Sequence, residues 1–472
     1  MKSDAVPASR RATRSMYTAV VAGLLFPLQE QLKRHTTVRV RRGMDLTEYW
    51  PADRLEQLRL DRLRRLLQRA QVQVPYYRDL FARTGFDARR DVTSLQALER
   101  LPLLDKALIR RHSNALRAED AGKLARFNTG GSSGEPLIFY IGKERVSHDV
   151  AAKWRATRWW DVDIGDPEIV VWGSPIELGA QDRGRAMRDR LMRTMLLPAF
   201  EMSERNLDAF VAQIRARRPR MLFGYPSALS HIARHAELRG QRMDDLGIRV
   251  AFVTSERLYD EQRAQIARVF SCAVANGYGG RDAGFIAHQC PHGSMHVTAE
   301  DIIVEIVDGQ GHALPPGATG EIVVTHLASG DFPFIRYRTG DIGALATQAC
   351  SCGRSLPVLR DIHGRSTDFL MAQDGTVIHG LALVYVLRDI EGMQAFKIIQ
   401  ESLQQTRVQV VVERPLDHSL HAHIVHGVQA RLGRAVEVLV EQVAAIAPEA
   451  SGKFRYVVSK VDAVGNYGAN TP

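Results

Sequence analysis

The stretch Phe127-Asn-Thr-Gly-Gly-Ser-Ser-Gly-Glu-Pro-Leu137 is the most informative part of this chain. Its three glycines allow tight turns and a close approach of the backbone to a ligand. Thr129, Ser132 and Ser133 add hydroxyl groups. A loop with so many N–H and O–H donors can bind an anion, and phosphate is the natural candidate. Taken alone, the same residues fit a flexible Gly/Ser connector better, because short motifs often match by chance.

The sequence that follows places this loop between two strands. Residues 137–141 (Leu-Ile-Phe-Tyr-Ile) have the β-branched and aromatic composition of a strand. The loop is therefore predicted to be a hairpin-like turn and not the start of a helix. It lacks a Gly-Lys-Ser/Thr ending, which excludes a phosphate-binding loop of the Walker type.

Strands and helices alternate after the loop. The pattern predicts a helix over 145–160, a long helical region over roughly 180–217, and strands over 168–172, 221–223 and 249–253. Small or polar residues follow these strands, as in Gly224-Tyr-Pro-Ser227 and Thr254-Ser-Glu256. This alternation predicts an α/β fold that binds ligands at the carboxyl ends of its strands.

The chain divides into three predicted parts: a basic peripheral segment at 1–45, a large domain at 46–364 and a small domain at 365–472. An amphipathic helix through residues 55–67 is expected to end before Pro75, because proline disfavours helix in the residue before it. The large domain includes a compact β region at 297–345, with strands expected over 302–307, 320–325 and 334–337. The small domain has the order β-β-α-β, with elements expected over 396–400, 407–412, 417–432 and 436–440.

Composition narrows the classes of function. The 472 residues include 63 Lys+Arg and 53 Asp+Glu, a net charge of +10 that suits an anionic ligand such as a nucleotide. The chain has no zinc-finger spacing, no RNA-binding aromatic signature and no long basic block, so a nucleic-acid partner is not expected. Four cysteines in a chain of this length do not make a disulfide scaffold, and a reducing, cytoplasmic setting is expected.

The N-terminal segment has two open interpretations. An apolar run from Ala19 to Leu28 precedes the basic stretch Lys33 to Arg42. The run is too short to span a bilayer, and no small-residue cleavage site of a signal peptide follows it. It is either a helix packed on the main domain, which is favoured, or a weak anchor at a membrane surface.

Four later stretches change the interpretation of the glycine loop. Each alone suits a turn, a linker or a basic tail, but in this order and across roughly residues 50–460 they resemble one family. It is the adenylate-forming superfamily of acyl-CoA synthetases, peptide-synthetase adenylation domains and luciferases. The stretches are Asn276-Gly-Tyr-Gly-Gly-Arg-Asp282, Tyr337-Arg-Thr-Gly-Asp341, His363-Gly-Arg-Ser-Thr-Asp368 and Ala450-Ser-Gly-Lys-Phe-Arg455.

Within that superfamily the chain is most similar to the phenylacetate-CoA ligase branch. Val74-Pro-Tyr-Tyr-Arg78, Leu101-Pro-Leu-Leu-Asp-Lys106 and Gly224-Tyr-Pro-Ser227 carry this narrower resemblance. Cys350-x-Cys-Gly-Arg354 and Gln400-Glu-Ser402 are similar to its capsular-polysaccharide and deazaflavin-cofactor-synthetase relatives. The resemblance implies a large multi-sheet N-terminal adenylation domain and a small mobile α+β C-terminal domain, hinged at 364–368.

The resemblance also implies a two-step reaction that uses ATP and Mg²⁺. A carboxylate would attack the α-phosphorus to give acyl-AMP and pyrophosphate, and a thiol, commonly coenzyme A, or an amine or carrier-protein arm would then displace AMP. Lys453 would bridge the carboxylate and the α-phosphate, as a compact ammonium can, and Arg281 could bind phosphate. The residues implied to bind nucleotide are Thr129, Gly130, Gly131, Ser132, Ser133, Gly134, Ser255, Glu256, Asn276, Gly277, Tyr278, Gly279, Asp282, Asp341 and Arg365.

Individual roles follow the same resemblance. Tyr278 would stack on adenine, Asp341 would accept both ribose hydroxyls, and Arg365 would lie beside the ribose and phosphate. The glycine loop would hold the β- and γ-phosphates, where developing charge needs fixed donors. An acyl pocket is expected at the predicted strand ends, near Trp172, Tyr225, Ser255 and Asn276.

Three departures from the family pattern weaken these assignments. Arg281 and Asp282 stand where the family has Ser/Thr and Glu, Thr367 stands where an aspartate forms the hinge, and Leu137 stands in place of a lysine. The first departure leaves two alternatives open: transfer of AMP to an acceptor other than coenzyme A, or a catalytically silent nucleotide-binding relative in a membrane-associated polysaccharide assembly. Intact Asp341, Arg365 and Lys453 favour an active enzyme.

A metal site is a separate prediction. Cys290, His296, Cys350 and Cys352 lie in two short stretches, and four thiolate and imidazole ligands would close a structural zinc site. The alternative is a set of buried free thiols. His292 lies in the same stretch but is not chosen as a ligand, and Cys272 is expected in the core.

Overall fold

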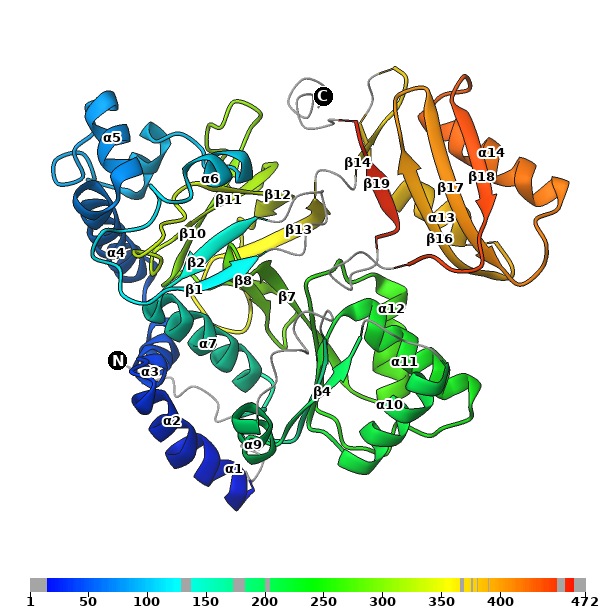
Figure 1. Cartoon of the computed structure of the whole chain (residues 1–472), viewed down its shortest axis with the longest axis horizontal. Coiled ribbons are helices and arrows are strands. Elements are labelled where there is room, and N and C mark those ends of the chain that lie inside the picture. The colour runs from blue at the N-terminus through cyan, green and yellow to red at the C-terminus, as the bar shows by residue number, and fades with distance from the viewer. Residues whose placement is uncertain are drawn as a thin grey trace.

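The computed structural model describes residues 15–128, 137–172, 183–199, 204–365, 369–374, 377–379, 381–388, 390–447 and 455–461. The glycine loop at 129–136, the hinge residues 366–368 and Lys453 lie outside the described residues. The fold is α/β, with a large mixed sheet in the N-terminal part and a smaller sheet in the C-terminal part (Figure 1).

The large sheet has eleven strands in the order β10-β11-β12-β13-β9-β8-β7-β6-β5-β3-β4. Strands β3 to β7 pair in parallel with their neighbours, and β7 to β13 pair antiparallel. The parallel strands are β3 (Glu168–Trp172), β4 (Thr194–Pro198), β5 (Met221–Gly224), β6 (Val250–Thr254) and β7 (Ala273–Gly280). The antiparallel strands are β8 (Gly284–Gln289), β9 (Met295–Val297), β10 (Ile302–Val307), β11 (Thr319–His326), β12 (Tyr337–Leu345) and β13 (Val358–Arg365).

Alternate residues of each parallel strand point to opposite faces of the sheet. Both faces of the parallel half are buried, because helices pack on each of them. On one face, Ile169, Leu222 and Val253 join a core with helices α10 (Glu204–Arg217), α11 (Pro226–Leu238) and α12 (Asp260–Phe270). On the other face, Phe223 and Phe252 pack with Ala156 of α7 (Lys143–Arg158).

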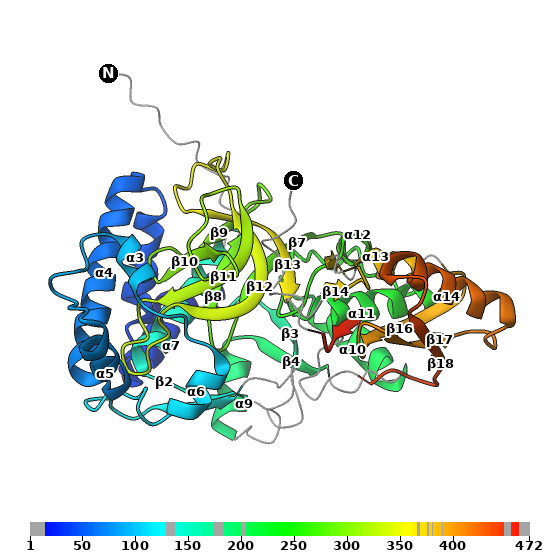
Figure 2. The same cartoon turned by 90° about the horizontal axis from the view of Figure 1, so that it is seen from above.

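The predicted hairpin around the glycine loop is confirmed for its two strands. Strand β1 (Ala125–Asn128) pairs antiparallel with β2 (Ile138–Ile141), and Asn128 lies opposite Ile138. The break before Pro75 is also confirmed, since α4 (Ala52–Gln73) stops there and α5 (Pro75–Thr84) starts with the proline. A 3-10 helix (Leu95–Arg100) and α6 (Lys106–His112) complete this region, and Figure 2 shows α4 and α5 at the end of the molecule opposite α14 (His418–Leu432).

Two predicted elements are wrong. The helical region expected over 180–217 is interrupted by strand β4, which lies between α9 (Arg183–Leu191) and α10 and pairs with β3. A short apolar run such as Met195-Leu-Leu cannot be told from a helical segment by periodicity alone. The strand expected over 334–337 starts only at Tyr337, because Arg336 has a φ of 50° that a strand does not tolerate.

The β region at 297–345 is not a separate unit. Strands β10, β11 and β12 continue the large sheet through β13, β9 and β8. The predicted strand at 302–307 matches β10, and the predicted strand at 320–325 lies within β11.

The C-terminal part has its own sheet and core. The predicted β-β-α-β order is confirmed by β16 (Met393–Gln400), β17 (Gln405–Val412), α14 and β18 (Glu437–Gln442). The sheet has the order β18-β17-β16-β19, where β19 spans Val457–Ser459, and β14 (Phe369–Met371), β15 (Val377–His379) and α13 (Leu381–Arg388) precede it. Tyr456 contacts Tyr259 at the start of α12, with ring centroids 5.6 Å apart. The exact boundaries of the three predicted parts stay a prediction.

The N-terminal segment, from residue 15, packs on the large domain as the favoured interpretation expected. It consists of α1 (Met16–Val20), a π-helical turn (Val21–Leu25), α2 (Phe26–Leu32) and α3 (Thr37–Thr47). The ring of Phe26 meets Trp154 of α7 edge to face, with centroids 5.1 Å apart. Within the described residues, every helix is too short or too polar to cross a membrane.

Candidate functional site

The predicted ligand-binding edge is formed by strand register. Val171 of β3 lies opposite Gly224 of β5, Gly224 lies opposite Val253 of β6, and Val253 lies opposite Asn276 of β7. The carboxyl ends of these parallel strands therefore meet at one edge. This edge brings together the segments that carry Trp172, Tyr225, Ser255, Glu256 and Asn276.

The side chains at this edge contact one another. Trp172 and Tyr225 stack with ring centroids 4.4 Å apart, and Glu256 Oε2 accepts a hydrogen bond of 3.2 Å from the backbone N–H of Ser227. Ser255 has a φ of 71°, a conformation that costs free energy for a residue with a side chain. Gly224 is required by a close approach, because a Cβ there would lie 2.3 Å from the Val171 carbonyl oxygen.

Tyr278, Asp341 and Arg365 are brought together from three strands. The Tyr278 hydroxyl donates a hydrogen bond of 2.7 Å to Asp341 Oδ2. Asp341 of β12 lies directly opposite Arg365 of β13 in the antiparallel pairing, which places their Cα atoms about 5 Å apart. The Arg365 side chain is outside the described part of the structure, so only its backbone position is defined.

The protonation of Tyr278 follows from its surroundings. Burial raises the pKa of the Tyr278 hydroxyl well above its ordinary value, and the neighbouring Asp341 carboxylate raises that pKa further. The hydroxyl therefore stays protonated and donates to the carboxylate. The half-buried ring of Tyr278 and the carboxylate of Asp341 together present a flat aromatic surface and a hydrogen-bond acceptor side by side.

A buried arginine stabilises the Arg281–Asp282 turn between β7 and β8. Arg145 of α7 is 2% exposed and donates hydrogen bonds of 3.0 Å and 2.6 Å to the carbonyl oxygens of Arg281 and Asp282. The Tyr337 hydroxyl donates a bond of 2.6 Å to Asp282 Oδ2. Gly279 in the same region has a φ of 157°, and a Cβ there would lie 2.2 Å from the Gly284 carbonyl oxygen.

Several predicted site residues cannot be placed. Thr129, Gly130, Gly131, Ser132, Ser133, Gly134 and Lys453 lie outside the described residues. The strand ends that flank the loop, Asn128 and Ile138, are defined, as are Arg455 and Tyr456 just after Lys453. The functional roles of these residues stay predictions.

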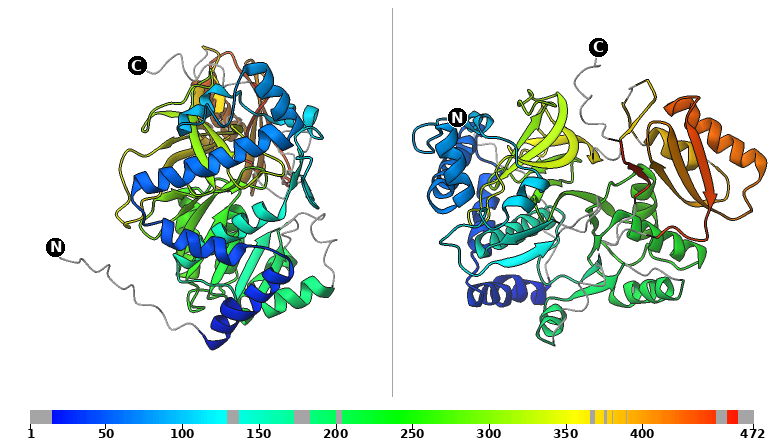
Figure 3. Two further views of the ribbon diagram at one scale, coloured as in Figure 1. Left: turned by 90° about the vertical axis from the view of Figure 1, so that its left-hand side faces the viewer. Right: turned by 45° about the horizontal axis from the view of Figure 1, so that its top comes forward.

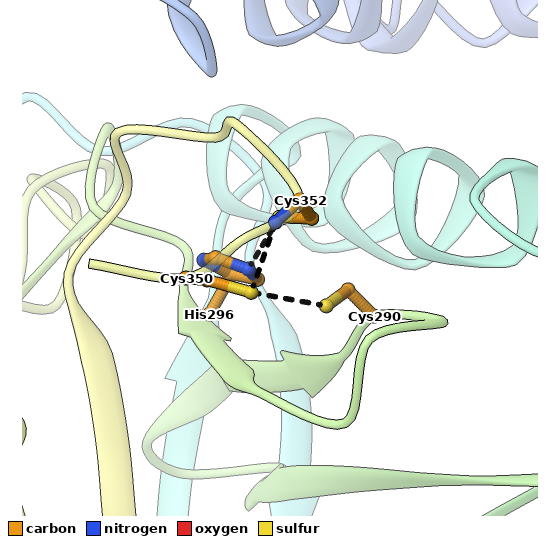
Figure 4. Close-up of side chains that lie close together, drawn as sticks. All are labelled: Cys290, His296, Cys350 and Cys352. Atoms are coloured by element: carbon orange, nitrogen blue, oxygen red, sulfur yellow. Dashed lines mark hydrogen bonds between the residues drawn. The ribbon is translucent and has the colours of Figure 1, made fainter. Parts of the chain in front are cut away.

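The four predicted metal ligands converge (Figure 4). Cys290 follows β8, His296 lies on β9, and Cys350 and Cys352 lie in the loop between β12 and β13. Their ligand atoms all lie within 4.8 Å of one another, with Cys290 Sγ and Cys350 Sγ 3.8 Å apart and Cys352 Sγ and His296 Nε2 3.2 Å apart. Two sulfurs bound to one tetrahedral zinc at about 2.3 Å would lie about 3.8 Å apart, so the sulfur separation fits the metal.

The chemistry of these ligands is compatible with a metal. Burial lowers the pKa of His296 to about 4 and keeps its imidazole neutral, which is the form that binds a metal. Burial raises the pKa of Cys290 to about 11. Burial also opposes ionisation of Cys350, but hydrogen bonds from Ser294 and the Cys352 backbone lower the pKa of that thiol overall.

The cluster connects the sheet to the N-terminal helices. Arg354, two residues after Cys352, forms an ion pair of 3.3 Å with Glu48, which follows α3. Trp159 meets the His296 ring edge to face, with centroids 5.8 Å apart, and donates a hydrogen bond of 3.0 Å to Glu48. His292 lies outside the cluster and is 3.1 Å from the Ser351 hydroxyl.

Arg145 and Tyr337 were not predicted as site residues. Arg145 lies 136 residues before Arg281, and its place in a helix gives no local signal of the turn that it supports. Tyr337 belongs to the Tyr-Arg-Thr-Gly-Asp motif, so its motif position could have drawn attention to it. Cys272 was expected in the core but is only half-buried and packs against the helix-covered core, and burial raises its pKa to about 12.

Comparison with known proteins identifies two parts of the chain. Residues 192–328 match the family model of AMP-binding enzymes, and residues 370–460 match that of the CapK C-terminal domain. Phenylacetate-coenzyme A ligase of Thermus thermophilus is 25% identical over 416 residues, which are 83% of this chain and 91% of the relative. Protein CapK of Staphylococcus aureus is 21% identical over 397 residues, 82% of this chain and 85% of the relative.

Solved structures share the fold. 2-Hydroxyisobutyryl-CoA ligase in its postadenylation state, in complex with R3-HIB-AMP, superposes with a TM-score of 0.69 at 22% identity and covers 88% of this chain and 91% of its own. The same ligase in its thioesterification state, with 2-HIB-AMP and CoA, has a TM-score of 0.59 at 21% identity and the same coverage. These structures show the fold, and the two family models and the curated relatives identify the family. The chain belongs to the AMP-binding, adenylate-forming superfamily, in its phenylacetate-CoA ligase/CapK-like branch.

Proposed function

We propose that this protein uses ATP to activate a carboxylic acid as acyl-AMP and then transfers the acyl group to a thiol, with coenzyme A as the acceptor. The observation that carries the proposal is the hydrogen bond of Tyr278 to Asp341, together with the backbone pairing that puts Arg365 directly opposite Asp341. An aromatic ring, a carboxylate and an arginine match the adenine, the ribose hydroxyls and the phosphate of a nucleotide.

In the first step a carboxylate oxygen of the substrate attacks the α-phosphorus of ATP. The bond from that phosphorus to the bridging oxygen breaks, and pyrophosphate leaves with the electron pair. Charge develops on the transferring phosphoryl group and on the leaving group, so cations and fixed N–H donors accelerate the step. Lys453 supplies the cation at the reacting oxygens, and the loop 129–134 supplies donors to the leaving phosphates.

In the second step a thiolate attacks the acyl carbon, and the bond from that carbon to the AMP oxygen breaks. The thiol gives its proton to solvent and AMP leaves. Rotation of the small domain between the two steps would remove Lys453 and admit the acceptor, as lids do in other enzymes. The assignment of coenzyme A rests on the similarity to phenylacetate-coenzyme A ligase and to 2-hydroxyisobutyryl-CoA ligase.

The Arg281–Asp282 departure changes the phosphate side of the site. Asp282 Oδ2 accepts from Tyr337, and Oδ1 accepts a hydrogen bond of 3.0 Å from the backbone N–H of Ala283. The carboxylate is therefore held in a fixed orientation, one residue from Arg281. We propose that Mg²⁺ bound to ATP meets this carboxylate while the Arg281 guanidinium takes the place of a hydroxyl at the α-phosphate.

ATP–pyrophosphate exchange tests the proposal. The assay uses aryl, short aliphatic, amino and sugar acids, and compares the unaltered protein with Lys453→Ala. Lys460→Ala is the matched control, because Lys460 is an exposed lysine of the same small domain, paired with Glu401. We expect exchange that depends on one class of acid, falls at least about a hundredfold in Lys453→Ala, and is unchanged in Lys460→Ala.

The acceptor is tested with the acid that supports exchange. Formation of its coenzyme A thioester, together with release of AMP, is the expected result. Exchange without thioester formation would exclude coenzyme A and point to an amine or a carrier protein. Absence of exchange with every acid, in a protein that still binds ATP, would contradict acid activation and leave AMP transfer or a silent nucleotide-binding role.

We also propose that Cys290, His296, Cys350 and Cys352 hold a structural zinc ion. The support is the sulfur separation of 3.8 Å and the buried neutral imidazole. Four protein ligands would complete the tetrahedral shell and leave no open position for substrate. The ion would stabilise the β12–β13 loop against β8 and β9, and it would not take part in the reaction.

Metal analysis of the purified protein tests the zinc site. One zinc per chain is expected in the unaltered protein, with loss of zinc in Cys350→Ser and full zinc in Cys272→Ser. Cys272 is the matched control because it is a free cysteine outside the cluster. Substoichiometric metal in the unaltered protein after growth in zinc-supplemented medium would contradict the site.

A further inference from the structure

The N-terminal helical segment, residues 16–32, exposes a continuous apolar stripe. Six large apolar side chains are open to solvent, and the exposed fraction reaches 85% at Met16 and 78% at Leu32. No charged residue occurs from 16 to 29. Large apolar surface gathered in one place on a folded protein indicates a contact with another apolar body. The stripe consists of Met16, Tyr17, Val20, Leu24, Leu28 and Leu32.

The opposite side of the same segment is fastened to the protein. Thr18 is fully buried and its hydroxyl donates a hydrogen bond of 2.8 Å to Asp166. Val21 is also fully buried, and it packs so closely on Gly165 that a Cβ there would lie 2.6 Å away. Phe26 packs on Trp154. The segment cannot rotate to bury its stripe without breaking these contacts, so the stripe is a fixed feature of the surface.

The local helix geometry keeps the stripe straight. Residues 16, 20, 24, 28 and 32 are four apart, and in an α-helix of 3.6 residues per turn each such step turns the side chain by about 40°. The π-helical turn Val21–Leu25 has a wider turn, which offsets part of this drift. All six apolar side chains of the stripe are accordingly exposed, whereas Thr18, Val21 and Phe26 of the same segment are buried.

Helix α9 adds to the same surface from a distant part of the sequence. Met187 is 66% exposed and Leu191 is 46% exposed. The Tyr17 hydroxyl donates a hydrogen bond of 2.9 Å to the Leu191 carbonyl oxygen, and the Arg193 guanidinium lies over the Tyr17 ring at 4.7 Å. Figures 1 and 3 show α9 next to α1 at the edge of the molecule. The stripe together with Met187 and Leu191 is called the apolar patch below.

The charges around the apolar patch are mainly basic. Helix α9 has the sequence RGRAMRDRL, with four arginines and one aspartate, and Arg190 and Arg193 are exposed. Lys33 and Arg34 are exposed just after Leu32. In sequence, residues 1–14 add one lysine and three arginines against one aspartate. An apolar surface bordered by cations matches an anionic lipid surface, where headgroups meet the cations and acyl chains meet the apolar side chains.

We propose that the apolar patch docks this protein on the surface of a membrane that contains anionic phospholipid. The segment of 17 residues, about 25 Å long, would lie in the plane of the interface, because its buried side stays attached to the protein along its length. The segment contacts Gly165 and Asp166, just before β3, and Leu191, just before β4, so the patch lies near the amino ends of these strands and not at their carboxyl edge. This inference is independent of the proposed reaction and holds whether or not the protein activates a carboxylic acid.

Vesicle co-sedimentation of the full chain tests the proposal. Vesicles of phosphatidylcholine alone are compared with vesicles of phosphatidylcholine and phosphatidylglycerol, at about 0.1 M and 0.5 M salt. We expect binding to the anionic vesicles that weakens at the higher salt. The double variant Leu24→Glu/Leu28→Glu should reduce binding at least about tenfold, because burial of each leucine is worth roughly tenfold or more in affinity.

Matched controls separate the patch from general effects. Leu238 of α11 is 77% exposed away from the patch, so Leu238→Glu should bind like the unaltered protein. Arg190→Glu/Arg193→Glu should remove the preference for anionic vesicles, whereas Arg89→Glu/Arg242→Glu, with the same change in net charge elsewhere on the surface, should keep it. Circular dichroism melting curves establish that every variant is folded.

Three results would overturn the proposal. The first is no binding of the unaltered protein to anionic vesicles at low salt. The second is binding that Leu24→Glu/Leu28→Glu leaves unchanged. The third is a dimer in solution that this double variant converts to a monomer, without any vesicle binding, because the patch would then be an interface between two copies of the chain.

Discussion

The carboxyl edge of the large sheet and the cysteine–histidine cluster are both formed by residues far apart in the sequence. The two regions differ in what their polar groups contact. At the edge and beside it, the carboxylates of Glu256, Asp341 and Asp282 accept hydrogen bonds within the protein, from the Ser227 backbone, Tyr278 and Tyr337 respectively. In the cluster, four ligand atoms point at one another within 4.8 Å. An open site that binds and releases a substrate needs its polar groups to be hydrogen-bonded between turnovers. A closed set of thiols and imidazole is instead suited to a central ion, as proposed above.

This difference separates activity from stability. The sheet is held by its strand pairing and by the cores on its two faces, so we expect loss of the side chains at the edge to affect the reaction more than the fold. Side chains in the cluster connect β8, β9 and the β12–β13 loop, so their loss should affect the fold more than the reaction. The four predictions below test this separation, beginning with the largest expected effect.

The largest effect is expected on removal of the proposed zinc ion. Cys352→Ser, or treatment of the unaltered protein with a strong zinc chelator, should destabilise the protein by about 4 kcal/mol if free zinc otherwise stands a thousandfold above its dissociation constant. Differential scanning calorimetry should show a lower melting temperature. Added zinc should restore the chelated protein but not the variant. If the chelator leaves the melting temperature unchanged, the cluster is a set of free thiols, and the two regions do not differ in their contribution to stability.

Asp341→Asn should lower activity much more than stability. It keeps the shape of the side chain but loses a charged acceptor for two ribose hydroxyls, so kcat/KM for ATP in the exchange reaction should fall roughly a hundredfold. The melting temperature should change by only a few degrees, since Asn can still accept from Tyr278. A large loss of stability with normal exchange would place Asp341 in the structural class and not in the nucleotide site.

Arg145→Lys tests whether a buried residue affects the reaction through the Arg281–Asp282 turn that it supports. A lysine keeps the positive charge near Asp149 but cannot donate to both carbonyl oxygens of the Arg281–Asp282 turn. We expect kcat of the exchange reaction to fall about tenfold with a smaller change in KM. Arg155→Lys is the control, because Arg155 is equally buried but pairs with Glu300 away from the turn. Equal losses in both variants would mean that Arg145 supports the fold alone.

The smallest effect concerns pH and stability. His288 of β8 is 1% exposed, stacks near Phe252 and Phe285, and neither ring nitrogen has a hydrogen-bond partner in the part of the chain that the structure describes. Burial lowers the pKa of His288 to about 3, below the unfolded value of about 6.5. A base with a lowered folded pKa contributes stability above its unfolded pKa and loses it as pH falls towards its folded pKa.

The unaltered protein should therefore lose about 1 kcal/mol more stability than His288→Leu between pH 7.5 and pH 6. Urea unfolding at the two pH values measures the difference. Subtracting the stability of the variant at each pH cancels the contribution of the other titrating groups and any constant packing cost. An identical pH dependence in both proteins would mean that His288 has a charged partner or solvent access, and that this part of the core is less closed than the cysteine cluster.

The broad outline of both regions could be predicted from the sequence, because short motifs carry their own chemistry. The residue types and spacing of Tyr337-Arg-Thr-Gly-Asp341 and of the cysteines can be recognised without knowing what surrounds them. The glycine loop lies outside the described residues, so its role stays a prediction. Strand ends could be found for the same reason, since Gly224-Tyr-Pro-Ser227 marks a turn by its composition. The interrupted helical region at 180–217 was missed because β4 is a short edge strand stabilised by its pairing with β3, which no local pattern reports.

The sequence by itself determined the family, the alternation of strands and helices, the residue types at the site and the four candidate metal ligands. Only the tertiary structure decided that Asp341 lies opposite Arg365, that Arg145 holds the Arg281–Asp282 turn, and that α9 meets α1 to form the apolar patch. The physical reason is that local propensity and periodicity act over a few residues. Strand register and the packing of a buried side chain depend on partners that are tens or hundreds of residues away.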